Sequence, residues 1–476
     1  NYADKLSPDK AIYKGAIPGM LRTLDPHSNF FDPKAFAGLR EEQHGMYFGI
    51  GMYIGPQPRT GKPMVMYPFG GSPAYKAGLR PGDVLLDVNG KRVDNLTTVQ
   101  VADLLKGPKG TKVEVTVSRE GSPKPIAFNL VRAEIPRNSV DTAFWVKPGI
   151  AYLHIQSFTE NTSQEVNDNL KRLGQRNIKG LILDLRENPG GLLQEGVAVA
   201  GRWLDRGQVV VTHKGRVYAD TPYLARGSKY GESYPIVVLV NRYTASAAEI
   251  VSGALQDHDR GWILGDTTFG KGLVQTVYPL SDNTGLALTT QHYYTPSGRL
   301  IQRDYSHISF LDYYYGKRSE KPIKSKMKET DLGRPVYGGG GITPDEKYQE
   351  PKLDAFELNT EHRNAFFDFS ASYFAHHSTK LPHGWIPSEK VLNDFHDYLM
   401  KDDITFTEAD WTRDHSWMRN HLRTEMYITA FSYADSQKVA VEQDPEIAAA
   451  VAAMPQAAHL LAESKAHFER QRASLR

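Results

Sequence analysis

The sequence contains no cysteine among its 476 residues. This absence excludes a cysteine nucleophile, a thiolate zinc site and any disulfide bond. No run of 18 apolar residues occurs, so no transmembrane helix is expected. Neither sign of charge is in large excess, since the chain has 57 lysine and arginine residues and 55 aspartate and glutamate residues. The formal net charge of +2 predicts no strong attraction to nucleic acid or to anionic lipid.

Metal-binding and targeting signals are scarce as well. No His-Glu-x-x-His motif is present, which argues against a zinc peptidase. His376 and His377 are adjacent and therefore poorly placed to share one metal ion. We expect neither a metal nor another cofactor. The first residues lack the basic and apolar regions of a secretory leader, so the protein is expected either to be cytosolic or to have lost a leader.

Length and residue pattern divide the chain into four predicted regions. Residues 1–45 are expected to form short helices, and residues 46–133 are rich in strand and turn signals. Residues 134–345 alternate strand and helix patterns, which is typical of an α/β layer architecture. Residues 346–476 lose the strand signals and are predicted to be helical. An apolar stripe in this last region is interpreted as core packing; it comprises Trp411, Met418, Leu422 and Met426.

The strand-rich region resembles a PDZ domain. A glycine-rich loop at residues 47–51 is followed by the turn at residues 77–83, a strand at residues 84–88 and the hairpin pair Asn89 and Gly90. In PDZ domains such a loop offers backbone N–H groups to the terminal carboxylate of a peptide, which adds a strand to the sheet edge. The resemblance implies a substrate-binding loop made of Tyr47, Phe48, Gly49, Ile50 and Gly51. The alternative is a plain β-sandwich in which the glycines only serve turns.

Ser246 is the first candidate for chemistry. It follows a predicted apolar strand at residues 236–240 and opens an alanine-rich helical stretch. A helix N-terminus presents free N–H groups and the positive end of the helix dipole. That environment suits a nucleophile whose attack creates an oxyanion. The alternative is that Ser246 is only a helix N-cap.

Lys271 is the candidate base, and it stands between Gly270 and Gly272, so close approach of the backbone is expected there. Lys271, Leu273 and Gln275 are spaced by two, so on a strand they would share one face and Lys271 could hydrogen-bond Gln275. A lysine activates a serine only when it is neutral. Its pKa must then fall from ~10.4 to roughly 7–8, and burial has this effect.

Two other readings of these segments are weaker. Residues 265–271 match the start of a phosphate-binding loop, but Gly272 replaces the Ser or Thr that would hold Mg²⁺, and a strand pattern follows instead of a helix. A Ser-His-Asp triad could use Asp257, His258 and Asp259, yet no Gly-x-Ser-x-Gly motif surrounds Ser246. His258 is expected at the far end of the helix that Ser246 opens, as a C-terminal helix charge.

A third segment, residues 183–191, ends a predicted buried strand with two glycines. The exposed backbone there could supply an oxyanion hole together with the N–H of Ala247. Gly191 is the expected donor and Gly190 the alternative. The segment could also be a strand-to-helix turn without a catalytic role.

Together these three segments resemble the carboxyl-terminal processing peptidases, also called tail-specific proteases. Residues 20–28 and 294–299 match that family too, and the resemblance extends over about residues 15–345. It implies an α/β (α+β) multidomain fold: a crotonase-like protease core with an inserted PDZ domain, an N-terminal helical segment and a C-terminal helical region.

The family resemblance also implies residue roles. Ser246 would be the nucleophile, Lys271 the base and Gln275 the partner of the lysine, with Ala247 and Gly191 as oxyanion donors and an acyl-enzyme as intermediate. Substrates would be proteins or peptides with free C-termini, and the location periplasmic or cell-envelope associated. The sequence allows a homo-oligomer and does not determine the oligomeric state. The competing hypothesis is a catalytically inactive, PDZ-containing peptide-binding protein, against which the presence of both Ser246 and Lys271 argues.

Overall fold

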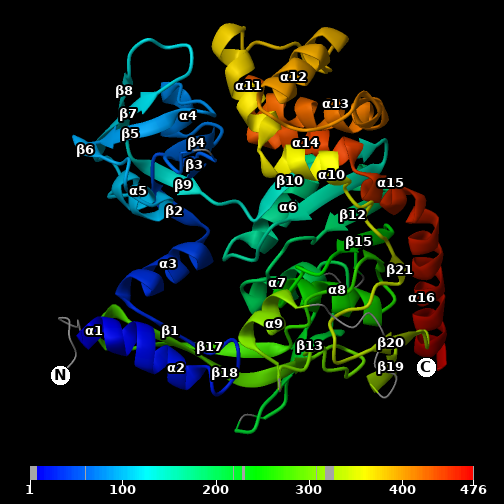
Figure 1. Ribbon diagram of the computed structural model, residues 1–476. Coiled ribbons are helices and arrows are strands. Elements are labelled where there is room, and N and C mark those ends of the chain that lie inside the picture. The colour runs from blue at the N-terminus through cyan, green and yellow to red at the C-terminus, as the bar shows by residue number, and fades with distance from the viewer. Residues whose placement is uncertain are drawn as a thin grey trace. The chain divides into compact units, whose positions relative to one another are not determined.

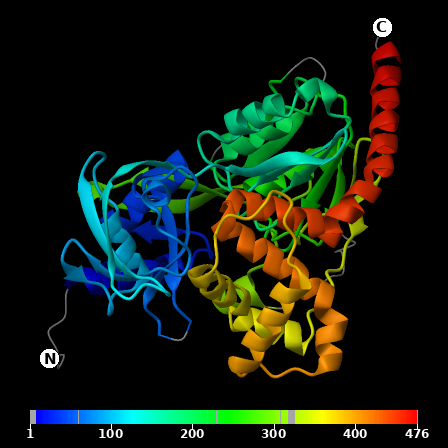
Figure 2. The same ribbon diagram turned by 90° about the horizontal axis from the view of Figure 1, so that it is seen from above.

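The computed structural model describes residues 8–474, apart from residues 59, 218, 228–230, 307 and 317–325. The chain divides into two compact units, each made of separate stretches of sequence. The first, called the core unit below, comprises Asn1–Gly45, Asn138–Gln349 and Ala448–Arg476. The second, the β–helical unit, comprises Met46–Arg137 and Glu350–Ile447. Figure 1 labels the elements of both units, and Figure 2 shows them in a second view.

A six-stranded sheet forms the centre of the core unit. In spatial order its strands are β10 (Val140–Lys147), β11 (Ile150–Ile155), β12 (Gly180–Asp184), β15 (Ile236–Val240), β16 (Trp262–Gly265) and β21 (Glu346–Lys347). β10 and β11 pair antiparallel, whereas the later pairs are parallel. All residues of β12 and β15 are buried. Parallel strands covered on both faces are expected to carry such apolar runs.

Four helices pack around this sheet: α6 (Thr162–Arg172), α7 (Leu193–Gly201), α8 (Ala247–Asp257) and α16 (Met454–Ser474). Every residue of α8 is buried, which explains why its sequence is apolar and small on nearly every side. α16 packs beside β15 and β16, so the end of the chain returns to the core unit.

An antiparallel sheet joins distant parts of the core unit. Its strands are β1 (Asn29–Phe31), β13 (Val209–Lys214), β14 (Thr221–Leu224), β17 (Leu273–Pro279) and β18 (Gly285–Tyr294). β18 pairs with β1, β13 and β17, and thereby ties the first part of the chain to the segment around Lys271. The smaller elements nearby are α1 (Pro8–Ala11), a π-helix (Ile12–Ala16), α2 (Ile17–Leu21), α3 (Pro33–His44), α9 (Phe310–Tyr315), β19 (Met327–Glu329) and β20 (Pro335–Tyr337).

The β–helical unit contains a second six-stranded sheet, which is antiparallel. Its strands are β3 (Met52–Pro56), β4 (Pro63–Pro68), β5 (Val84–Val88), β6 (Lys91–Arg92), β7 (Lys112–Ser118) and β8 (Ile126–Val131). Helices α4 (Pro73–Ala77) and α5 (Thr98–Leu105) accompany it. β2 (Met46–Gly49) and β9 (Ala133–Pro136) form a separate antiparallel pair at the two ends of this stretch of chain. The region 46–133 is thus β-rich, as its sequence predicts.

Helices form the rest of the β–helical unit: α10 (Ala355–His362), α11 (Ala365–His376), α12 (Glu389–Lys401), α13 (Glu408–Ala430) and α14 (Tyr433–Gln443), followed by α15 (Pro445–Ala452). The predicted apolar stripe on α13 is confirmed as core packing, because its four members are buried. The helices also contact the sheet of the same unit, where the rings of Tyr67 and Tyr433 stack at 4.2 Å. Sequence analysis did not anticipate that these two regions pack together.

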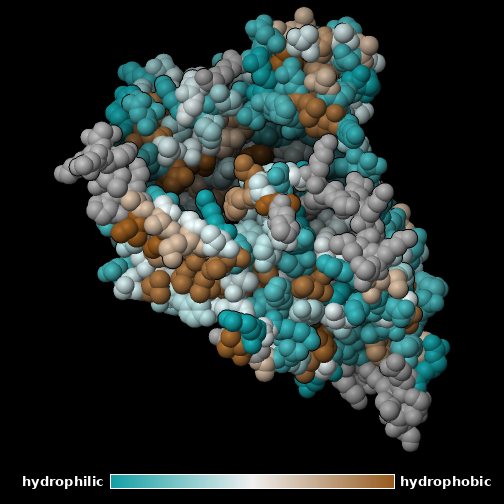
Figure 3. Space-filling view, turned by 60° about the horizontal axis from the view of Figure 1, so that its bottom comes forward, coloured by the Kyte–Doolittle hydropathy of each residue, from teal (hydrophilic) through white to brown (hydrophobic). Residues whose placement is uncertain are grey.

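Two surface features of the units stand out. Figure 3 shows apolar side chains gathered over the N-terminal helices, and Met20 and Leu24 are 70% and 60% exposed there.

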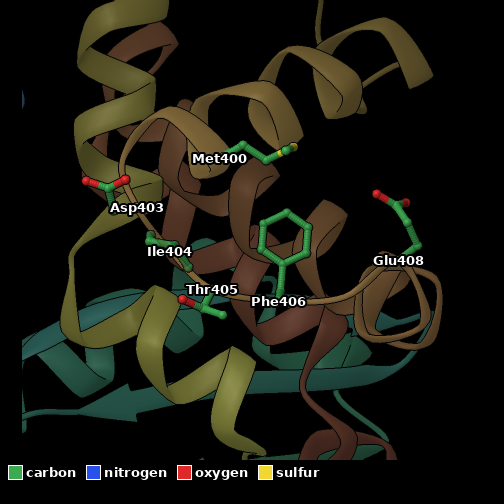
Figure 4. Close-up of a pocket in the computed structure, with 6 residues that line it drawn as sticks. All are labelled: Met400, Asp403, Ile404, Thr405, Phe406 and Glu408. Atoms are coloured by element: carbon green, nitrogen blue, oxygen red, sulfur yellow. The ribbon is translucent and has the colours of Figure 1, made fainter.

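In the β–helical unit a pocket of about 290 Å³ is lined by Met400, Asp403, Ile404, Thr405, Phe406 and Glu408. Its Met400 and Phe406 lie between the two carboxylates (Figure 4).

Within the described residues, no helix has both the length and the apolar character that a bilayer crossing requires. The same part of the chain holds no group of three or more histidine, aspartate and glutamate side chains arranged to bind a metal ion.

Candidate active site

Ser246 lies where the sequence predicts, between the buried strand β15 and helix α8. It is the N-cap of α8, with φ 55° and ψ −115°. An ordinary N-cap has extended backbone, and a positive φ at a residue other than glycine costs on the order of 1–3 kcal/mol. Thr244 and Ala245 hold this loop, because Thr244 Oγ1 donates to Leu185 O at 2.8 Å and Ala245 N donates to Asn188 O at 2.9 Å. The surroundings thus hold this N-cap in an unusual conformation, and such conformations cluster at functional sites.

Glu249, in the first turn of α8, connects the loop of the serine with the loop of the lysine. Its side chain is completely buried. Oε2 accepts from Ser246 N at 2.8 Å and from Lys271 N at 2.9 Å, so both backbone nitrogens meet one oxygen atom. Oε1 accepts from Gly270 N at 2.7 Å and from Thr268 Oγ1 at 2.5 Å. Burial raises the pKa of Glu249, whereas these four hydrogen bonds favour the ionised form.

Lys271 stands in the loop just before β17 and is partly buried. Burial lowers the pKa of its amine, and the charges of Glu249 and Asp25 oppose this effect. Among the described residues no carboxylate forms an ion pair with Nζ. The flanking glycines are required by close backbone approach, as the sequence predicts: a Cβ at Gly272 would come within 2.8 Å of Gln302 N. The environment thus shifts Lys271 toward the neutral form that a base needs.

Gln275 lies on β17, but its side chain points to a different partner from the predicted one. Its Nε2 donates to Thr289 Oγ1 at 3.2 Å on β18. Lys271 precedes the strand, so the two-residue alternation of β17 does not extend to it. The register of the pair shifts between Val274 and Gln275, where β18 carries the extra residue, and this shift places Thr289 opposite Gln275.

The turn after β12 brings two glycines beside Ser246. Asn188 is fully buried there, and its Oδ1 accepts from Gly190 N at 2.8 Å. A Cβ at Gly190, whose φ is 98°, would come within 2.7 Å of Ser246 Cβ, so only glycine fits. Gly191 is exposed, and neither its N–H nor that of Ala247 has a hydrogen-bond acceptor within the described ranges. Both N–H groups are free to bind an oxyanion.

Residues 25–28 reach the same site from the N-terminal part of the chain. Asp25 accepts hydrogen bonds from His27 N and from Ser28 Oγ, at 2.7 and 2.6 Å. His27 Nε2 lies 2.9 Å from Tyr313 OH. Burial, aided by the nearby charge of Lys271, lowers the pKa of His27 to about 3, which keeps its ring neutral. Sequence analysis used these residues only as a family match, and nothing local in the sequence shows that they lie beside the lysine.

The competing sequence interpretations do not fit this geometry. His258 is the C-cap of α8, where its Nδ1 lies 2.7 Å from Asp331 Oδ2 and its Nε2 lies 2.8 Å from Val209 O. Ser246 is the N-cap at the other end of that 11-residue helix, about 18 Å away at 1.5 Å per residue. The segment after Lys271 is the strand β17 and not the helix that a phosphate-binding loop requires.

The predicted peptide-binding loop, residues 47–51, lies in the β–helical unit. Tyr47, Phe48 and Gly49 belong to β2 and pair with β9, so the first half of the loop is a strand. Ile50 is 2% exposed and packs in the core of the unit, so its side chain is not available to a ligand, whereas Phe48 is 38% exposed. The carbonyl groups of Ile50 and Gly51 accept hydrogen bonds from Ala74 N and Phe69 N. In the described part of the chain their own N–H groups have no acceptor.

Comparisons with known proteins agree on one family. A model of peptidase family S41 matches residues 149–307, and a PDZ domain model matches residues 70–119. The chain is 38% identical over 299 residues to a carboxy-terminal-processing protease of Bartonella bacilliformis, which covers 62% of this chain and 68% of that protein. A carboxyl-terminal-processing protease of Synechocystis is 39% identical over 292 residues, or 60% and 68% of the two chains. The solved photosystem II D1 C-terminal processing protease is 30% identical, covers 73% of this chain and 84% of its own, and has a TM-score of 0.39.

Proposed function

Because the chain belongs to the family of carboxyl-terminal-processing serine proteases, we propose that it cleaves its protein substrates with Ser246 as nucleophile and Lys271 as general base. One observation carries this assignment: Glu249 Oε2 accepts from the backbone N–H of both residues. Incubation of an unfolded protein with the purified chain, followed by mass spectrometry of the fragments, tests it. New peptide termini should appear, and their formation should depend on Ser246.

The proposed reaction needs no metal and proceeds in two stages. Neutral Lys271 takes the hydroxyl proton of Ser246 while Oγ bonds to the carbonyl carbon of the scissile peptide, and the electron pair of the C=O bond moves to its oxygen. The oxyanion then collapses, the C–N bond breaks, and the leaving amine takes the proton from the Lys271 ammonium. Water hydrolyses the acyl-enzyme by the same steps, with Lys271 again accepting and returning the proton.

We assign the oxyanion hole to the backbone N–H groups of Ala247 and Gly191. Two preorganised donors of this kind stabilise charge that exists only in the transition state. The hydrogen bond from Gly190 N to Asn188 supports Gly191 over Gly190, since the N–H of Gly190 is already engaged. The open N-terminus of α8 adds the positive end of a helix dipole beside Ala247.

Gln275 is proposed to orient the amine of Lys271 once its amide turns away from Thr289. A neutral amide can hold a lysine without restoring its charge. We expect Gln275→Ala to lower kcat about 10-fold, which is the loss of one hydrogen bond worth about 1.4 kcal/mol. Thr289→Ser is the matched control, because it keeps the hydroxyl that contacts Gln275 and Asp25 and should keep the wild-type kcat. Wild-type activity of Gln275→Ala at every pH would show that the amide does not assist the lysine.

We propose that the PDZ domain captures the free C-terminus of the substrate. The unpaired N–H groups of Ile50 and Gly51 support this role, because a carboxylate forms charge-assisted hydrogen bonds with such donors. Phe48 is the exposed apolar neighbour available to the last side chain of the substrate. Capture of the tail would raise the local concentration of the rest of the chain at the protease site.

Peptides of one sequence with free and with amidated C-termini test this recognition. Amidation removes the charge, and we expect it to weaken binding about 10–100-fold, because hydrogen bonds to a charged group contribute about 1.5–3 kcal/mol. Affinities are best measured on the Ser246→Ala protein, where cleavage cannot interfere, and cleavage rates on the wild type. Equal affinities and equal rates for both peptides would exclude tail recognition and leave the Ser–Lys assignment untouched.

We also propose a periplasmic or cell-envelope location, on the strength of the family resemblance alone. Fractionation of cells that make the protein from its full gene tests this proposal. Recovery in the cytosolic fraction would contradict it.

A further inference from the structure

Tyr293 is a buried tyrosine whose hydroxyl reaches the backbone of both proposed catalytic residues. It stands near the end of β18 and is 1% exposed. Its hydroxyl lies 3.2 Å from Ser246 O and also contacts Lys271 O. Its own N–H donates to Gly272 O at 2.9 Å, which ties the strand to the loop of the lysine.

Tyr293 and Glu249 act on the same two residues through opposite chemistry. Glu249 Oε2 accepts from the N–H groups of Ser246 and Lys271, and the hydroxyl of Tyr293 donates toward their C=O groups. The hydroxyl has a single proton, so it donates to one of the two carbonyl oxygens at a time. Both oxygens lie close enough to accept that hydrogen bond. Two buried side chains, from α8 and β18, thus contact all four backbone polar groups of the pair.

The surroundings of Tyr293 preserve its donor role. Burial, together with the charge of Glu249, raises the pKa of the phenol well above 10, so the hydroxyl keeps its proton over the whole working range of pH. The carbonyl of Ser246 also accepts from Ile250 N at 3.0 Å in the first turn of α8, whereas the carbonyl of Lys271 lies in a loop before β17. The hydroxyl of Tyr293 therefore matters most to Lys271 O, because a buried carbonyl left unsatisfied costs about 1–3 kcal/mol.

We propose that Tyr293 is a positioning residue for the reaction: with Glu249 opposite, it sets the spacing between the backbone of Ser246 and that of Lys271. The inference rests on the proposed Ser–Lys function. Tyr293 contacts the backbone of the two residues and not their reacting atoms, and acts by keeping Ser246 in its positive-φ conformation. A misplacement of about 1 Å between reacting groups can cost 10²-fold in rate.

Tyr293→Phe removes one oxygen atom and keeps the packed ring. We expect kcat on a peptide substrate to fall about 10–100-fold with KM unchanged, and the rate at which a fluorophosphonate labels Ser246 to fall by the same factor. The matched control is Tyr234→Phe in the same unit, because Tyr234 is 6% exposed and its hydroxyl accepts from Trp203 Nε1 at 3.0 Å. The control should lose similar thermal stability and keep wild-type kcat.

Rates are expressed per folded molecule, with the folded fraction taken from near-ultraviolet circular dichroism. If Tyr293→Phe yields no folded protein, Glu249→Gln is measured in the same way and should show the same fall in kcat at constant KM. If the variant that folds, Tyr293→Phe or Glu249→Gln, has the same kcat as the wild type, the positioning role is wrong. The Ser–Lys proposal fails by a different result, namely retained proteolysis in Ser246→Ala.

Discussion

Ser246→Ala is expected to abolish proteolysis. Loss of the nucleophile in a serine protease lowers kcat by about 10⁶-fold, because no other group can form the acyl-enzyme. The positive-φ backbone, the free N–H groups beside it and the link through Glu249 all make Ser246 the reactive serine of this chain. The measurement is the rate of new peptide termini from an unfolded protein, compared with wild type.

Ser252→Ala is the matched control for this experiment. Ser252 lies on the same helix α8, is fully buried, and donates its hydroxyl to Ala248 O at 2.9 Å. That variant should keep wild-type kcat, and both variants should melt as cooperative folded proteins. Cleavage by purified Ser246→Ala at more than a few per cent of the wild-type rate would contradict the assignment of the nucleophile.

Lys271→Ala is expected to be as inactive as Ser246→Ala, and the double variant no worse than either, because residues that act as one unit are not additive. Lys271→Arg should fail as well, since a guanidinium stays protonated in proteins. Substantial activity of the Arg variant would show that residue 271 is not the base.

The pH dependence of the wild-type rate follows from the same residue. Burial lowers the pKa of Lys271 below the ordinary 10.5, and only the neutral amine can accept the proton of Ser246. The rate should therefore rise with pH and level off above this lowered pKa. A rate that falls between about pH 6 and 8 would contradict the role of a neutral lysine.

The features that sequence analysis predicted are those encoded in local pattern. The apolar run of β15 and the alanine-rich stretch after it predicted a strand followed by a helix, with Ser246 at the start of the helix. The glycines beside Lys271 predicted that other backbone comes close to this loop. The backbone of Gln302 does so at Gly272. The stripe on α13 had the period of a helix face, and it is buried.

The features that were missed depend on contacts between residues far apart in the sequence. Nothing in the pattern of α8 or β18 shows that Glu249 and Tyr293 meet at the same two peptide groups. The hydrogen bond from Gln275 to Thr289 was not predicted, because it depends on which residue of β18 stands opposite Gln275. The burial of Ile50 was not predicted either, because its core neighbours come from distant parts of the same unit.

The most direct test of the Ser–Lys assignment is the rate at which a fluorophosphonate labels Ser246 as a function of pH. This reaction reports activation of the nucleophile and needs neither substrate binding nor product release. We predict a single labelled residue, Ser246, a labelling rate that rises with pH to a plateau, and loss of this rate in Lys271→Ala while the protein stays folded. Labelling of Lys271→Ala at the wild-type rate, or labelling of another serine, would contradict it.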